Sequence, residues 1–218
     1  MNQTHHHPST LRRLRSVIPA TRSDVSFAEA LRTAELQAAL LHECLDHGDG
    51  ITEAAIANLP RIRIARETLA SVGSSHWNGR EWVICLNAQD PLTRQRFTLL
   101  HELKHIIDHG NSRVLYRGDM YRTREVQAEV AADYFAGCAL VPKRELKRAW
   151  GNGLQRPEQL AEHFGVSIQA IEVRLDQTGL SRVVDHVLAP RCARPIYTPR
   201  GYRQRFRTAL RYPARSPA

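Results

Sequence analysis

The chain has 218 residues, of which 42% are hydrophobic, and its formal net charge is +9. This length allows one well-buried domain with tails or two small domains. No apolar run approaches the roughly 20 residues that a membrane-spanning helix needs, so we expect neither a membrane protein nor a membrane partner.

Residues 1–24 contain arginines but no apolar core of a signal peptide, which favours a flexible segment on a cytoplasmic protein. Residues 26–47 then place leucines and alanines at helical spacing. Ser26 followed by Glu29 is the pattern of a capping box, and Gly48 is a typical stop signal. We therefore predict a helix over this segment.

The four cysteines are scattered and form no C-x-x-C pair. Cys85 and Cys138 lie in apolar surroundings, which predicts buried free thiols. His42, Cys44 and His47 form a small cluster with metal-binding chemistry. A helix that carries these polar residues by chance is the favoured interpretation.

Residues 61–87 change to a partly alternating pattern that contains two turn signals. Asn78-Gly79 is a strong hairpin signal. We predict two or three antiparallel strands, of which the last covers residues 81–87. If this last strand is an exposed edge, it can pair with an extended polypeptide substrate.

Two long helices are predicted after these strands. Asp90 and Pro91 are suited to the N-cap and first position of a helix that Gly110 ends. The second helix covers residues 123–140 and stops before Pro142. Strands that lie between runs of helix favour an α+β fold over alternating β/α units.

The first of these helices carries the pattern His-Glu-x-x-His at residues 101–105. Residues four apart lie on one face of a helix, so His101 and His105 can bind the same zinc ion. Glu102 lies about 100° around the helix, where it can act as a general base on a water. The alternative is an amphipathic helix whose apolar face only builds the core.

A catalytic zinc site needs a third protein ligand. Glu125, Glu129 and Asp133 form a carboxylate stripe on the next helix, flanked by alanines that permit close helix packing. Periodicity does not choose among these three carboxylates. His109 extends the histidine face by one turn, but three residues of one straight helix rarely converge on one ion. We therefore assign it either a role in supporting a ligand or a structural role.

Three segments resemble the ImmA/IrrE metallopeptidases: RQRFTLLHELKHIIDH (94–109), VICLN (83–87) and EVAADYFAGCALVP (129–142). The resemblance extends over residues 30–182 in weakening degree and implies Glu129 as the third ligand. It also implies a zincin-like fold and a cytoplasmic endopeptidase that cleaves helix-turn-helix repressors or antitoxins. Lys104 departs from the small residue usual at its position, but it lies off the ligand face.

Ala161, Gly165 and Ile171 have the spacing of a DNA-binding helix-turn-helix. The helix after Gly165 would be the reading helix. It exposes only one arginine, Arg174, which is little cationic support for DNA binding. We therefore favour a structural helical pair.

The basic charge is concentrated near the C-terminus. Residues 189–218 hold eight of the 31 basic residues and none of the 22 acidic residues. Aromatic residues are interleaved with these arginines. This composition is suited to binding nucleic acid through phosphate neutralisation and base stacking. A disordered solubilising tail is an equal alternative.

The sequence thus predicts an α+β fold with a zincin-like core over residues 25–153, mostly helical with a small antiparallel sheet. A helix-turn-helix-like module (154–188) and a disordered tail (189–218) follow. The predicted function is a zinc-dependent endopeptidase acting on a helix-turn-helix repressor or antitoxin, with manganese or iron as alternative metals. The alternative function is a DNA-binding regulator with a structural or sensory metal site.

Overall fold

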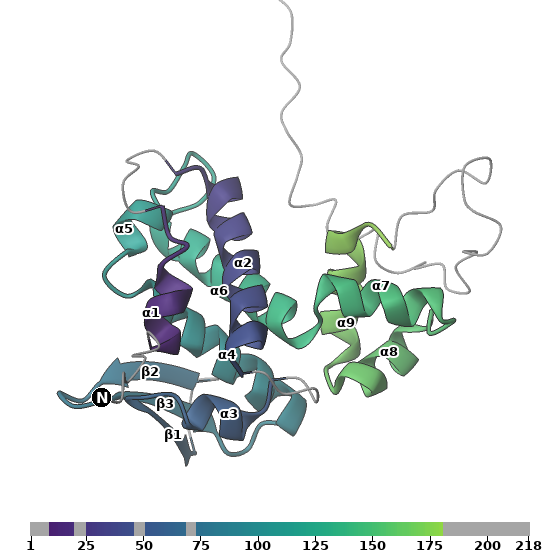
Figure 1. Ribbon diagram of the computed structural model, residues 1–218, viewed down its shortest axis with the longest axis horizontal. Helices are drawn as coiled ribbons and strands as arrows, with labels where there is room; N and C mark the ends of the chain where they lie inside the picture. The colour runs from purple at the N-terminus through teal and green to yellow at the C-terminus, as the bar shows by residue number, and fades with distance from the viewer. Residues whose placement is uncertain (1–8, 20–24, 46–50, 69–72, 181–218) are drawn as a thin grey trace, which may run out of the picture.

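The computed structural model describes residues 9–19, 25–45, 51–68 and 73–180 (Figure 1). The predicted helix stop at Gly48, the ligand candidate His47 and the arginine-rich tail lie outside these residues. In chain order the described elements are α1 (Thr10–Arg15), α2 (Phe27–Leu45), α3 (Glu53–Ala57), β1 (Ile62–Glu67), β2 (Gly73–Trp77), β3 (Trp82–Asn87), α4 (Leu92–Asp108), α5 (Ser112–Leu115), α6 (Arg124–Leu140), α7 (Lys143–Gly151), α8 (Pro157–Phe164) and α9 (Ile168–Thr178).

The three strands form a mixed sheet in the order β1-β3-β2. The predicted hairpin is confirmed, since β2 pairs antiparallel with β3 and the Asn78 side chain accepts backbone N–H bonds within the turn. The prediction of a purely antiparallel sheet was wrong, because β1 pairs parallel with β3. The condition that residues 81–87 form an exposed edge is not met. Strand β3 is central, and its continuous apolar run Val83–Leu86 is buried, as is typical of a strand covered on both sides.

Helix α4 lies between the sheet and α6, and α6 in turn packs against α2 (Figure 1). Small residues permit this close approach, since Ala132 and Ala136 on α6 are fully buried. Pro91 rather than Asp90 is the N-cap of α4, because Pro91 has ψ 148°, outside the helical region. The helix therefore begins at Leu92, one residue later than predicted.

Residues 10–15 form helix α1, so the expectation of flexibility is corrected for this part of the N-terminal segment. Leu14 is fully buried. The Arg15 guanidinium donates to the carbonyl oxygens of Ile107 at 2.9 Å and Ile106 at 2.7 Å. Because the last carbonyls of a helix lack partners within the helix, this arginine caps the C-terminal end of α4.

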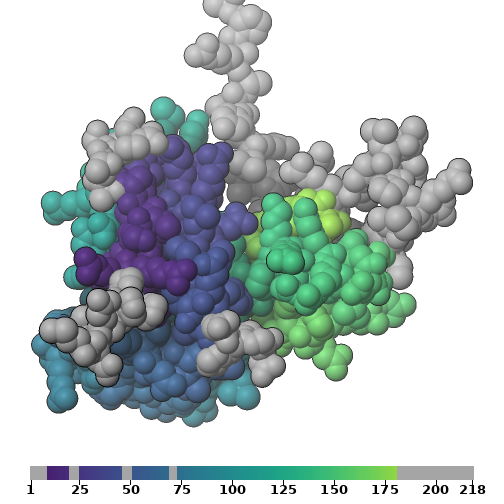
Figure 2. Space-filling view, viewed as in Figure 1, coloured from purple at the N-terminus to yellow at the C-terminus, as the bar shows by residue number. Residues whose placement is uncertain are grey.

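Helices α7, α8 and α9 form a lobe beside α2, shown in green (Figure 2). The turn at Gly165 has φ +60° and Ser167 caps α9, as the sequence pattern indicated. The expected exposure of Arg174 was wrong. This side chain is buried, and its Nε donates to the Val141 carbonyl at 3.2 Å, so it attaches α9 to the end of α6.

Two further sequence predictions are confirmed by the described residues. The capping box at the start of α2 is confirmed: the Ser26 N–H donates to Glu29 and the Glu29 N–H donates to the Ser26 hydroxyl. Cys85 and Cys138 are buried free thiols, as predicted. Among the described helices, none combines the length and the apolar character that crossing a bilayer requires.

Candidate metal centre

The two histidines of the His-Glu-x-x-His pattern project from one face of α4. The Nε2 atoms of His101 and His105 lie 3.1 Å apart. Two nitrogens bound at 2.0–2.1 Å to one tetrahedral zinc ion would be separated by about 3.3 Å. The side chains are half-buried, which leaves this face of α4 open to solvent on one side.

Glu129 reaches the same point from α6. Its carboxylate oxygens lie 3.2 Å from Nε2 of His101 and 3.4 Å from Nε2 of His105. One donor atom from each of the three residues lies within 4.8 Å of the other two. Periodicity alone left Glu125, Glu129 and Asp133 equivalent, but the α4–α6 packing brings Glu129 to the position between the imidazoles.

Asp133 lies one helical turn after Glu129 and contacts the other nitrogen of the His101 imidazole. Its Oδ1 is 2.9 Å from Nδ1 of His101. A hydrogen bond at Nδ1 leaves Nε2 of the neutral ring as the atom that can bind a metal. The sequence offered Asp133 only as an alternative ligand, whereas the structure places it behind His101.

The two imidazoles differ electrostatically. Burial lowers the pKa of His101, but the hydrogen bond and charge of Asp133 outweigh burial, so the pKa lies above the usual value. Burial and the neighbouring His101 charge hold the pKa of His105 below the usual value. A neutral His105 is the form that a metal ligand requires.

Glu102 lies beside the three converging side chains without joining them. Its Oε2 accepts a hydrogen bond of 2.7 Å from the Ser75 hydroxyl on β2. The carboxylate is thereby fixed between the helix and the sheet. Ser75 was missed by the sequence analysis, because nothing in a single polar residue of a short strand indicates which helix it faces.

A buried polar network joins Lys104 and Asp108 of α4 to Tyr116. The Lys104 ammonium is fully buried and donates to both carboxylate oxygens of Asp108, at 2.5 and 2.6 Å. The Tyr116 hydroxyl also donates to Asp108, at 2.5 Å. Burial, reinforced by the Asp108 charge, raises the pKa of Tyr116, whereas burial lowers the pKa of Lys104. Lys104 therefore lies off the ligand face, as predicted.

Other histidines considered in the sequence have different surroundings. His109 packs its ring against the Trp82 indole with 4.9 Å between ring centroids. Nε2 of His42 lies 2.8 Å from the Ala139 carbonyl oxygen. Among the described residues, neither joins the group formed by His101, His105 and Glu129.

Two imidazoles and a carboxylate that meet between adjacent helices beside a small sheet define an α+β domain with a candidate metal centre. Residues 60–176 match the family model of Peptidase M78, described as the IrrE N-terminal-like domain. The chain belongs to this family, which confirms the resemblance to the ImmA/IrrE proteins.

Two known proteins are similar to parts of the chain. A propionyl-CoA carboxylase regulator of Cereibacter sphaeroides is 33% identical over 93 residues, which are 41% of this chain and 20% of that protein. A solved structure of a Mycobacterium tuberculosis transcriptional regulator has a TM-score of 0.57 at 17% identity, covering 86% of this chain and 55% of that one. This likeness concerns the fold. The chain thus spans about a fifth of the length of the curated relative.

Proposed function

We propose that the protein is a zinc-dependent endopeptidase in which His101, His105 and Glu129 bind the metal and Glu102 is the general base. The observation that supports this proposal best is the convergence of three donor atoms from two helices within 4.8 Å of one another. Glu102 lies next to this group, held by Ser75 rather than directed at the same point.

The chemistry of the donor set fits zinc. Two imidazoles and one carboxylate form a common catalytic zinc set that leaves a coordination position open, while manganese and iron are alternative occupants. A zinc ion there supplies the Lewis acidity that amide hydrolysis needs. Glu102 accepts the proton of the attacking water and returns it to the leaving amine. Asp133 holds His101 in the tautomer that presents Nε2.

The substrate lies along β2 in this proposal, and not along residues 81–87, which were considered as an edge. In the strand order β1-β3-β2, strand β2 is paired only on its β3 side within the described sheet. Its Ser75 contacts Glu102, so an extended polypeptide added to the outer side of β2 passes beside the general base. Backbone pairing of this kind binds a substrate largely independently of its side chains.

The substrate class we propose is a helix-turn-helix repressor or antitoxin in the cytoplasm. The family resemblance points to such substrates, and both similar proteins carry the word regulator in their names. A DNA-binding regulator with a structural or sensory metal site is the second candidate, favoured by those names. The burial of Arg174 counts against α9 as a reader of DNA, because it removes a cation from the helix surface.

The test combines elemental metal analysis with incubation of the full chain and the helix-turn-helix regulator encoded beside its gene. We expect one zinc per chain and one defined cut that a chelator abolishes. Glu102→Gln should keep the metal and lose the cut, whereas the control Glu125→Gln, an exposed carboxylate of α6, should keep both. Cleavage by Glu102→Gln would refute the assigned base. Salt-dependent binding of operator DNA without any cleavage would favour the second candidate.

A further inference from the structure

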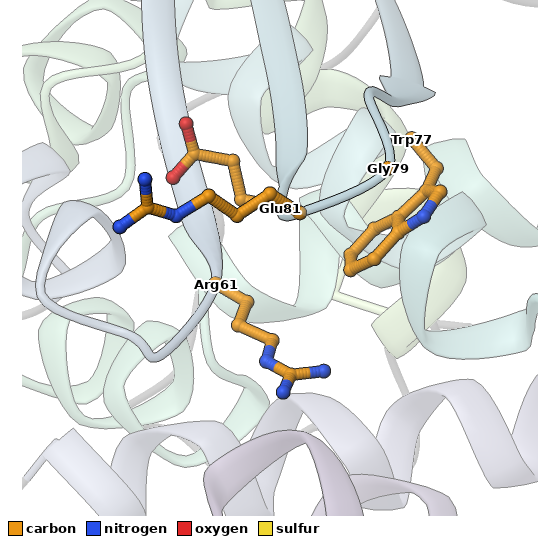
Figure 3. A pocket seen from close by; sticks show the side chains of 5 residues that line it. Arg61, Trp77, Gly79 and Glu81 are labelled. Atoms are coloured by element: carbon orange, nitrogen blue, oxygen red, sulfur yellow. The ribbon is translucent and has the colours of Figure 1, made fainter.

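A pocket of about 490 Å³ lies at the end of the sheet where β2 ends and β1 and β3 begin (Figure 3). Its lining consists of Arg61, Trp77, Gly79, Arg80 and Glu81. Trp77 ends β2, Gly79, Arg80 and Glu81 lie between β2 and β3, and Arg61 immediately precedes β1. The metal centre does not use any of them.

The pocket carries uncompensated positive charge. The Glu81 carboxylate is engaged by Nε of Arg63 at 3.0 Å. Within the described part of the chain, the guanidinium groups of Arg61 and Arg80 form no ion pair. Two exposed guanidinium groups beside an indole that is 43% exposed therefore present donors and an apolar wall to solvent.

The backbone holds Arg61 in an unusual conformation. Its φ is +62°, a left-handed value that non-glycine residues rarely adopt. The Arg61 carbonyl accepts the Trp82 N–H at 2.8 Å, which anchors this residue to the first residue of β3. Strained positions of this kind persist where the surrounding structure fixes them, and they cluster at ligand sites.

The pocket lies in line with the proposed catalytic centre. Ser75 contacts Glu102, and Trp77 follows two residues later on the same face of β2. At about 3.3 Å per residue, Trp77 is roughly 7 Å further along the strand. A polypeptide that pairs with β2 beside Glu102 therefore reaches the pocket two to four residues from the bond to be cleaved.

We infer that this pocket is a specificity subsite for an aspartate or glutamate side chain of the bound polypeptide. Arginine donates two parallel hydrogen bonds to a carboxylate, and Trp77 covers the apolar part of the bound segment. Nucleic acid is disfavoured as the ligand, because the pocket offers only two free cations and Glu81 forms part of its wall. This inference rests on the proposed endopeptidase function.

The first experiment measures binding without cleavage. Acetylated, amidated ten-residue peptides, each with one Asp or one Asn at a stepped position in an otherwise neutral serine-valine sequence, are titrated against zinc-loaded Glu102→Gln protein by tryptophan fluorescence. We expect the best Asp peptide to bind roughly tenfold more tightly than its Asn counterpart, the scale of a charge-assisted hydrogen bond. Equal binding of every Asp and Asn pair overturns the inference.

Substitutions of the pocket arginines test whether the pocket causes the preference for Asp. Arg61→Gln combined with Arg80→Gln should abolish the preference for Asp, and Arg80→Gln alone should reduce it if the double variant does not fold. Arg144→Gln removes the same charge from an exposed position on α7 and should leave the preference intact. If the double variant keeps the preference for Asp, the proposed acid-specific peptide subsite is contradicted. Equal displacement of the peptide by a short single-stranded DNA also contradicts it.

The second experiment reads the same preference from cleavage. The wild-type protein is incubated with a peptide library from a digested bacterial proteome, and the cut sites are identified by mass spectrometry. We expect enrichment of acidic residues at one fixed position two to four residues from the cut, on one side only, and its loss in the double variant. Cleavage without that enrichment refutes the proposed subsite but is consistent with the proposed endopeptidase function. If the library stays intact while Asp peptides still bind, the proposed endopeptidase function is refuted instead.

Discussion

Asp133 and His101 are joined by a contact of 2.9 Å between Oδ1 and Nδ1, which turns Nε2 of the same ring toward Glu129. Two residues of α6, one turn apart, thus act on one histidine of α4 from its two sides. This relationship links the ligand geometry to the packing of α4 on α6.

Asp133→Asn tests that relationship. An amide can still accept from Nδ1 but carries no charge, so the ring should bind metal more weakly. We expect zinc affinity to fall roughly 10- to 100-fold, the usual cost of losing a partner of a metal-bound histidine. Competition with a chromophoric chelator measures this affinity, and Glu125→Gln serves as the control. Unchanged affinity in Asp133→Asn would show that the aspartate has no part in metal binding.

Ser75→Ala removes the hydrogen bond to Glu102 without touching the candidate ligands. We expect zinc content to stay at the wild-type level, while kcat falls about tenfold because the base loses its fixed position. Ser75→Thr restores the hydroxyl and should recover most of the rate. If KM rises with kcat unchanged, Ser75 acts in substrate binding instead.

Lys104→Met should destabilise the fold strongly. Among the described residues, the substitution leaves the buried Asp108 carboxylate with the Tyr116 hydroxyl as its side-chain donor. Removing one partner of a buried ion pair lowers the free energy of unfolding by about 3–5 kcal/mol. The double variant Lys104→Met, Asp108→Asn removes both charges and should regain most of that free energy of unfolding. Urea denaturation of both variants measures the difference, and an equal loss in the two would contradict the charge argument.

Stability should fall at alkaline pH. Burial raises the pKa of Cys138 to about 11 and, with nearby Cys138 and Glu35, that of Tyr134 to about 12. The folded state keeps these protons at pH values where the unfolded chain, with ordinary pKa values of 9.0 and 10.0, releases them. These two groups therefore lower the free energy of unfolding as pH rises from about 9 to 12. Lys104, whose pKa is lowered, contributes with the opposite sign below its ordinary pKa of 10.5.

Chemical denaturation across that pH range measures this slope. Tyr134→Phe combined with Cys138→Ala removes both groups, so its slope should be shallower than that of the wild type whatever its absolute stability. Buried Tyr116, whose pKa is also raised, contributes to the part of the slope that remains. An identical slope in the double variant would assign the alkaline loss to other groups.

The sequence by itself determined the features that depend on residues close in the chain. His101, Glu102 and His105 share one helix, so the 3.6-residue period alone places both imidazoles on one face and the carboxylate beside them. The hairpin at Asn78-Gly79 and the capping box at Ser26 are likewise local, because turn and cap geometry involve only a few consecutive residues.

Only the tertiary structure decided which distant groups meet. Periodicity left Glu125, Glu129 and Asp133 open, and the family resemblance implied Glu129; the packing of α6 on α4 brings Glu129 to both imidazoles. The contact of Ser75 with Glu102 and the burial of Arg174 likewise depend on how separate elements pack. The place of β3 in the centre of the sheet depends on its parallel partner β1, from which β3 is separated in the chain by β2. A periodic pattern specifies the face of an element that is buried, whereas the neighbour that covers this face is set by the packing of the whole core.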